Sequence, residues 1–224
     1  KSVATITEQV GTDSVDAVYT VVEREINGFT VKYIERFAER IFPNGVADAW
    51  CVDSGLQYNG TPATSFTGAE HLAGKTVTGL ADGVVITPFV MPVNGFFTLA
   101  TAASKVTVGL AFTPKLQTLA LDLGEPTVQG KRKKIPAVTA RCQETLGLSM
   151  GKSFSDLTPM KDLVLGNVGS MTNELVTGLV TGDARTVIPP QWDVPGQYCI
   201  QQSYPLPATI LGLIPEVVVG DTIK

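Results

Sequence analysis

The chain has 224 residues, of which 44% are hydrophobic and 17% charged, and its formal net charge at pH 7 is −4. This length suffices for one or two domains that bury a hydrophobic core. So low a charge content excludes a disordered, solvated chain, and the mild negative charge excludes a protein whose bulk surface binds nucleic acid. No apolar run reaches the roughly 18 residues of a membrane-spanning helix.

The composition favours strands over helices. Val and Thr are abundant, and 22 Gly and 14 Pro supply frequent turns. The three cysteines, Cys51, Cys142 and Cys199, are odd in number and far apart, which argues against a disulfide framework and against a zinc site. A reducing compartment is the simpler interpretation. The first residues show neither the basic nor the apolar region of a signal peptide, so none is expected.

The clearest local feature is a long β-hairpin within residues 1–42. Polar and apolar residues alternate over 16–24 and again over 29–37, and Asn27-Gly28 lies between them. Asn-Gly readily adopts the two positive φ angles of a type I′ turn, which fixes the register. The predicted pairs are Ile26–Phe29, Glu23–Lys32, Val22–Tyr33 and Val18–Phe37. The result is a half-buried ribbon that projects from a body or packs along a neighbour.

Similar turn signals recur along the chain. Asp82-Gly83 and Asn94-Gly95 predict two further hairpin turns, and Asn44-Gly45 and Asn59-Gly60 mark additional turns. Together with strand candidates at 105–111, 116–123 and 136–142, this spacing predicts a small antiparallel sandwich or barrel with little helix.

The expected domain organisation has three parts. Residues 1–42 form the hairpin, residues 43–146 together with 193–224 form an antiparallel β domain, and residues 147–192 form a long irregular excursion. Residues 208–219 are nearly all apolar, which is typical of a strand buried on both faces. We expect this strand to pair with the sheet that precedes residue 146.

Residues 69–76, with the sequence AEHLAGKT, satisfy the loose form of a phosphate-binding loop. Such a loop needs a buried strand before it and a helix after it, so that phosphate meets the helix N-terminus. Here a polar, turn-rich stretch precedes the motif, and the predicted Asp82-Gly83 hairpin follows it at once. We therefore expect a turn and no nucleotide or other cofactor.

Candidate catalytic groups are few. His71 is the only histidine, no Gly-x-Ser-x-Gly motif accompanies it, and a hydrogen-bonding role in a turn is expected. Glu23 and Glu25 share one strand face, but Lys32 opposite Glu23 makes them ordinary polar residues of the ribbon. We assign no catalytic, cofactor-binding or metal-binding residue and predict that the chain is not an enzyme.

One dense basic run, Lys131, Arg132, Lys133 and Lys134, is a candidate subunit contact. It could bind an acidic patch on a partner, or it could be the solvated start of a strand that keeps a sheet edge from pairing. The sequence leaves both interpretations open.

Several short fragments, in this order along the chain, resemble the tail nozzle (tail tube) proteins of short-tailed bacteriophages. They are Val18-Tyr19, Val21-Val22-Glu23-Arg24, Asn27-Gly28, Tyr33-Ile34-Glu35-Arg36, residues 53–60, residues 68–75, residues 80–83, Val108-Gly109-Leu110, residues 116–119, residues 129–135, Phe154, Thr181-Gly182-Asp183, Ile200-Gln201-Gln202, residues 205–210 and Pro215-Glu216. The fragments span nearly the whole chain, and residues 147–192 match least.

The resemblance implies a homo-hexameric tube in the virion tail, assembled in the cytoplasm of the bacterial host. Genomic DNA would leave through its lumen without sequence-specific binding, beneath an adaptor ring, with tail fibres or spikes outside. Members of the family are considerably longer than this chain, which therefore resembles the later portion of a subunit or a shortened one. The resemblance also implies that residues 68–75 form a turn.

Two other functions remain as alternatives. A receptor- or carbohydrate-binding module of a tail appendage would need an aromatic platform, yet aromatics are 7% of the chain. A hydrolase of the host envelope would need catalytic residues that the sequence does not show.

Overall fold

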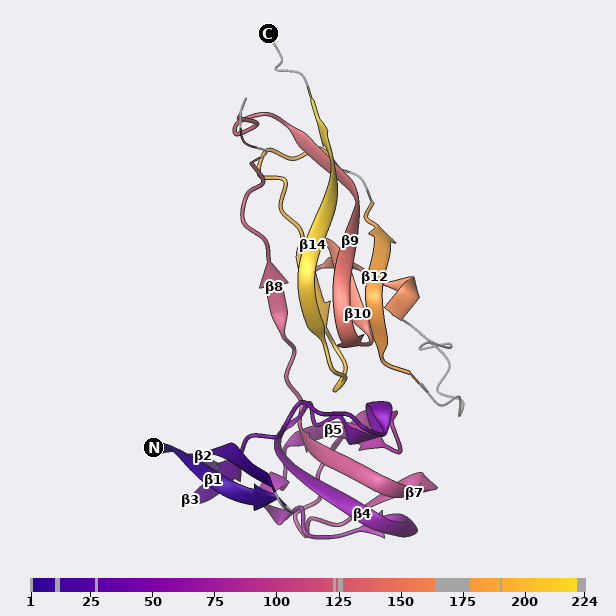
Figure 1. Ribbon diagram of the computed structural model, residues 1–224. Coiled ribbons are helices and arrows are strands. Elements are labelled where there is room, and N and C mark those ends of the chain that lie inside the picture. Colours follow the sequence, from indigo (N-terminus) through magenta and orange to yellow (C-terminus); the bar gives the residue numbers. More distant parts are fainter. Residues whose placement is uncertain are drawn as a thin grey trace. The chain divides into compact units, whose positions relative to one another are not determined.

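The computed structural model describes residues 2–10, 13–26, 28–122, 124, 127–163, 178–189 and 191–220. In these residues the fold is mainly β, built from antiparallel sheets without a closed barrel, and its few helical segments are short 3-10 turns (Figure 1). The predicted mainly β fold with little helix is confirmed, whereas the barrel alternative is wrong. The chain divides into two compact units, Lys1–Ala111 and Phe112–Lys224.

The first unit begins with a three-stranded sheet. Its strands are β1 (Ser2–Val10), β2 (Asp13–Ile26) and β3 (Phe29–Arg36), with β2 in the centre. The pairs Ile26–Phe29, Glu23–Lys32 and Val22–Tyr33 occur as predicted, and the Phe37 N–H donates to the Val18 carbonyl at 2.9 Å. Gly28 has a φ of 83°, while Asn27 lies outside the described residues. Strand β1, rich in Val, Ile and Thr, was not predicted.

A four-stranded sheet forms the body of this unit. It contains β4 (Asp53–Phe66), β5 (Thr76–Ala81), β6 (Val84–Val90) and β7 (Phe97–Leu110), in the order β4-β7-β5-β6. The 3-10 turns η1 (Gly45–Asp48) and η2 (Glu70–Leu72) flank it. Phe66 and Phe97 stack with their ring centroids 5.2 Å apart, in a core that also contains Leu72, Val77 and Met91.

Only some of the predicted turns occur as predicted. Asp82-Gly83 is a tight β5–β6 turn with φ angles of 48° and 86°, as predicted. Asn94-Gly95 is a turn, but it joins β6 to β7, which are not neighbours in the sheet, so the hairpin expected there is wrong. Asn59-Gly60 lies inside β4, so no chain reversal occurs there. A turn signal gives the local backbone conformation, whereas the pairing partner depends on the whole sheet.

The second unit is a sandwich of two sheets. Their strands are β8 (Lys115–Gln117), β9 (Lys133–Thr145), β10 (Leu148–Ser153), β11 (Asp156–Pro159), β12 (Val180–Val187), β13 (Cys199–Gln202) and β14 (Thr209–Val219), with η3 (Lys161–Leu163) as a short 3-10 turn. The orders are β12-β9-β14 and β11-β10-β13-β8. Val138 of the first sheet and Met150 and Ile200 of the second share one buried core, so the sheets pack face to face.

These units differ from the predicted domains. The boundary between them falls after Ala111, inside the segment 43–146 that the sequence predicts as one body. The excursion predicted at 147–192 instead contains β10, β11 and β12, whereas residues 164–177 and 190 lie outside the described residues.

Strand β14 pairs with β9, as expected, but it is an edge strand. Its Leu211, Ile214 and Val218 are exposed, so the prediction of burial on both faces is wrong. In the described part of the chain, no helix has the length and apolarity that crossing a membrane requires.

Candidate functional site

The motif at residues 69–76 forms a core turn. It follows β4, passes through η2 and leads directly into β5, so a strand stands where a phosphate-binding loop needs a helix. Ala69, Leu72 and Ala73 are buried, and the Gly74 N–H donates to the Met91 carbonyl at 2.9 Å. The predicted turn is confirmed, and its apolar residues serve packing.

His71, within this turn, takes part in a junction between the body and the three-stranded sheet. Its Nε2 lies 2.8 Å from the carbonyl oxygen of Ser54, and its ring lies 5.9 Å from that of Tyr33 on β3. Ser54 has a φ of 49°, and its hydroxyl donates to Glu35 at 2.5 Å. The hydrogen-bonding role expected for His71 is therefore seen, but its partners come from segments that no sequence motif connects.

Glu35 is the centre of this junction. Arg24 donates to both of its carboxylate oxygens, at 2.8 and 3.0 Å. Burial alone would raise the pKa of Glu35, but the hydrogen bonds from Arg24 and Ser54, with the charges of Arg24 and His71, outweigh it. The pKa of Glu35 is therefore lowered, and this carboxylate helps to hold the sheet against the body.

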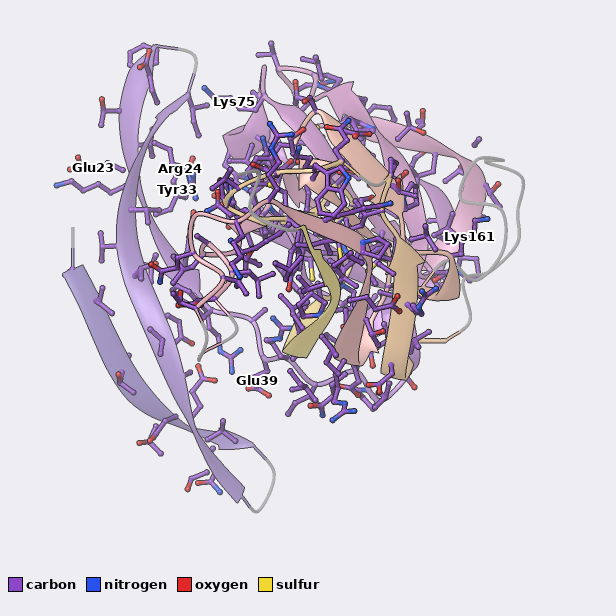
Figure 2. All side chains as sticks on the ribbon, turned by 90° about the horizontal axis from the view of Figure 1, so that it is seen from above. Glu23, Arg24, Tyr33, Glu39, Lys75 and Lys161 are labelled. Carbon is purple, nitrogen blue, oxygen red and sulfur yellow. The ribbon has the colours of Figure 1, made fainter. Side chains whose placement is uncertain are left out.

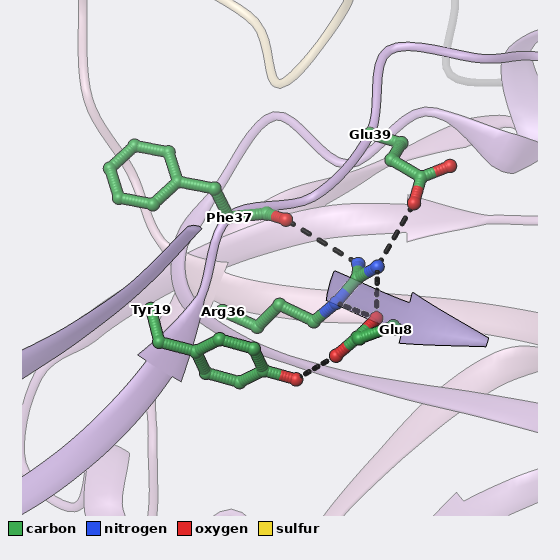
Figure 3. Close-up of polar contacts among 5 residues, drawn as sticks. All are labelled: Glu8, Tyr19, Arg36, Phe37 and Glu39. Atoms are coloured by element: carbon green, nitrogen blue, oxygen red, sulfur yellow. Dashed lines mark hydrogen bonds and ion pairs between the residues drawn. The ribbon is translucent and has the colours of Figure 1, made fainter. Parts of the chain in front are cut away.

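The opposite face of the same sheet carries a second polar cluster (Figure 3). Glu8 accepts hydrogen bonds from Tyr19 and Arg36, and Arg36 also donates to Glu39 at 2.9 Å. The hydrogen bonds from Arg36 and then Tyr19 lower the pKa of Glu8. This cluster ties β1 to β3 across β2, which stabilises a sheet with little core of its own.

Glu23 and Glu25 lie near the turn of the hairpin, and Glu23 and Arg24 project from opposite sides of β2 (Figure 2). Lys32 lies 3.8 Å from Glu23, in a pair whose side chains are 71% and 42% exposed. Such a pair contributes little free energy, in agreement with an ordinary polar ribbon face.

The three-stranded sheet exposes an unusual amount of apolar surface. Among its described side chains only Ala17 is buried, whereas Phe29 is 73% and Ile34 is 75% exposed. The other exposed apolar side chains are Val3, Ile6, Val18, Val31 and Phe37. They occupy both faces, so the sheet is a candidate contact surface for another molecule. Alternation predicted the apolar face, but not how little of it the body covers.

A cleft of about 520 Å³ opens in the first unit between the segment that follows β3 and the body sheet. Its lining includes the half-buried Trp50, Gln57, and an ion pair between Lys105 and Asp48. Burial alone would raise the pKa of Asp48, but hydrogen bonds from Lys105 and Asn44 lower it. No sequence pattern indicates this cleft, because most of its lining lies within residues 36–50 and the cleft forms only where this segment meets Gln57 and Lys105 of the body sheet.

Strand β9 begins inside the basic run of residues 131–134, at Lys133. Lys133 is 2% exposed, and its ammonium donates to the Val194 carbonyl at 2.7 Å, while its backbone pairs with Asp193. As a candidate subunit contact Lys133 is therefore wrong, because its charge is bound within its own unit. Lys131, Arg132 and Lys134 are at least partly accessible: Lys134 lies on the other face of β9 from Lys133, whereas Lys131 and Arg132 precede the strand.

All three cysteines are free thiols, and burial raises the pKa of each. Within the described residues, no group of three or more His, Cys, Asp or Glu side chains is placed to hold a metal ion.

No protein-family model matches the chain, and no curated protein matches it significantly.

Proposed function

We propose that this chain is a structural subunit of a homo-oligomeric ring or tube, the tail nozzle of a short-tailed bacteriophage. The observation that carries the proposal is the sheet β1-β2-β3, whose apolar side chains, Phe29 and Ile34 foremost, remain exposed in the single chain. Exposed apolar patches of this kind mark surfaces that other molecules cover.

A repeating assembly suits this sheet because its edges, β1 and β3, are also unpaired in the described residues. Proteins cover exposed strand edges to prevent uncontrolled pairing, and neighbouring subunits can provide the cover. The two compact units, each with its own core, provide a framework on which the sheet can be presented.

The specific assignment to a tail nozzle rests on the ordered sequence fragments that resemble this family. It includes a hexameric ring in the virion tail, contacts to an adaptor ring and to tail fibres or spikes, and passage of genomic DNA. The low charge content and the net charge of −4 support this role, because a strongly basic lumen would retain DNA through its phosphate contacts.

Oligomeric state tests the proposal. Light scattering after gel filtration and negative-stain electron microscopy of the purified chain should reveal ring-shaped oligomers. The double variant Phe29→Ser, Ile34→Ser should weaken assembly without lowering the unfolding midpoint, because both side chains are already exposed in the single chain. Leu119→Ser, at an exposed apolar position outside the sheet, is the control and should assemble normally. A wild-type chain that stays monomeric at all concentrations would refute the proposal.

The cleft beside Trp50 supports a second candidate, a carbohydrate-binding module. Its cations are neutralised within the chain, Lys105 by Asp48 and Arg36 by Glu8 and Glu39, which favours a neutral polyhydroxylated ligand over an anion. Calorimetric titration with neutral oligosaccharides would show binding that Trp50→Ala abolishes and Trp192→Ala preserves. Absence of any binding would exclude this candidate.

A further inference from the structure

The tip of the β2–β3 hairpin carries two carboxylates on one side and large apolar side chains on the other. Pairing with β1 ends at the Ser2–Val21 pair, so beyond Val21 the described ribbon has only two strands. Glu23 and Glu25 are exposed on one face, and Phe29 and Val31 on the other, as strand alternation requires. We call Glu23, Glu25, Phe29 and Val31 the acidic tip.

A complementary surface lies in the second unit, where β9 begins. Lys131, Arg132 and Lys134 carry three positive charges, and within the described residues none of them forms an ion pair with a carboxylate. Lys133 between them points inward and binds the Val194 carbonyl, which fixes the segment that follows Trp192 beside the start of β9.

Apolar side chains accompany these charges. Val218 pairs with Lys134 across the β9–β14 ladder, and the indole of Trp192 lies against Gly220, whose N–H donates to the Arg132 carbonyl at 2.8 Å. Trp192 and Val218 are 48% and 47% exposed. We call Lys131, Arg132, Lys134, Trp192 and Val218 the basic corner.

We propose that the acidic tip of one copy of this chain binds the basic corner of a second copy. The corner is positively charged, and the tip has a net negative charge because Lys32, opposite Glu23, offsets only one of its two carboxylates. Both surfaces also expose apolar side chains. Aromatic residues and arginine are the types that dominate binding energy at protein interfaces, and complementary charge accelerates and orients association. The inference rests on the proposed oligomeric function and names the surfaces that would meet.

The contact would be heterologous, because the tip and the corner are different surfaces. Heterologous contacts close into rings when the rotation between neighbouring copies allows closure. A nucleic acid is the weaker alternative, since it would neutralise the basic corner but leave the acidic tip and Phe29 without a partner.

Charge reversal tests the pairing directly. One variant carries Glu23→Lys and Glu25→Lys, and the other carries Lys131→Glu, Arg132→Glu and Lys134→Glu. At about 0.15 M salt, where exposed charges still act over about 8 Å, each variant alone should associate at least about tenfold more weakly than the wild type in sedimentation velocity. An equimolar mixture of the two should recover assembly, because each reversed surface then meets an opposite charge on the other chain. One chain with all five reversals should also assemble.

The control variant, Glu70→Lys with Lys75→Glu, reverses two exposed charges of the turn at residues 69–76 and should assemble like the wild type. Thermal unfolding of each variant should match the wild type, which shows that the folds are intact. If the reversed variants assemble normally while the wild type forms rings, the tip–corner contact is wrong and the proposed function stands. If only the five-fold reversal in one chain recovers assembly, the contact lies within a single chain and the inference is overturned.

Discussion

At the scale of single residues, several positions are determined by backbone proximity that no local pattern reveals. Gly79 in β5 is one of them: a Cβ atom there would lie 1.8 Å from the Thr107 carbonyl oxygen on the neighbouring strand β7. Lys133 is another, because its buried ammonium finds a carbonyl partner 61 residues away in sequence. Both depend on which segments of the chain lie side by side in the fold.

Gly79→Ala should destabilise the first unit by about 3 kcal/mol, since the β5–β7 ladder must open to admit the methyl group. The free energy of unfolding in urea measures this loss. Gly212→Ala, at a glycine with no atom near its Cβ position, is the matched control and should change stability by less than about 1 kcal/mol. Equal effects of the two substitutions would contradict the close approach at Gly79.

At the scale of elements, the attachment of the β1-β2-β3 sheet to the body depends on polar contacts. Arg24, Glu35, Ser54 and His71 form a continuous chain of hydrogen bonds from β2 to the turn that contains η2. Because apolar packing of this sheet is sparse, its stability should respond to the protonation of Glu35.

The pKa of Glu35 is lower in the folded chain than its ordinary value, so its contribution to stability is present above the ordinary carboxyl pKa and is lost as pH falls through the folded value. Glu35→Gln should therefore cost about 1 kcal/mol at pH 7, and this cost should shrink below about pH 4. Chemical unfolding of both proteins across pH measures the difference. Glu70→Gln, at an exposed position, is the control, and a cost of Glu35→Gln that stays constant with pH would contradict the assignment.

At the scale of the whole molecule, every strand pair in the described residues falls within one of the two units. Each unit also has its own hydrophobic cluster, centred on Phe66 and Phe97 in the first and on Val138 and Met150 in the second. Hydrogen bonding and core formation are thus local to each half of the chain.

Residues 1–111 and 112–224, expressed separately, should each give a β-type circular dichroism spectrum and a cooperative unfolding transition, because no described ladder is cut. Division after residue 146 should instead yield insoluble or unfolded fragments, since it separates β9 from β12 and β14. Folding of both fragments from the second division would show that the boundary is misplaced.

The sequence by itself determined the class of the fold, the register of the first hairpin and the turn at Asp82-Gly83, because alternation and turn chemistry act between residues close in the chain. Only the tertiary structure decided which strands Asn94-Gly95 connects, that β14 is exposed and that the Lys133 side chain points inward. It also decided the cleft beside Trp50 and the division after Ala111. These features depend on which strands become neighbours, and that choice minimises the free energy of a whole sheet and its core. Local sequence patterns do not indicate which strands become neighbours, because the contacting residues are separated by tens of positions along the chain.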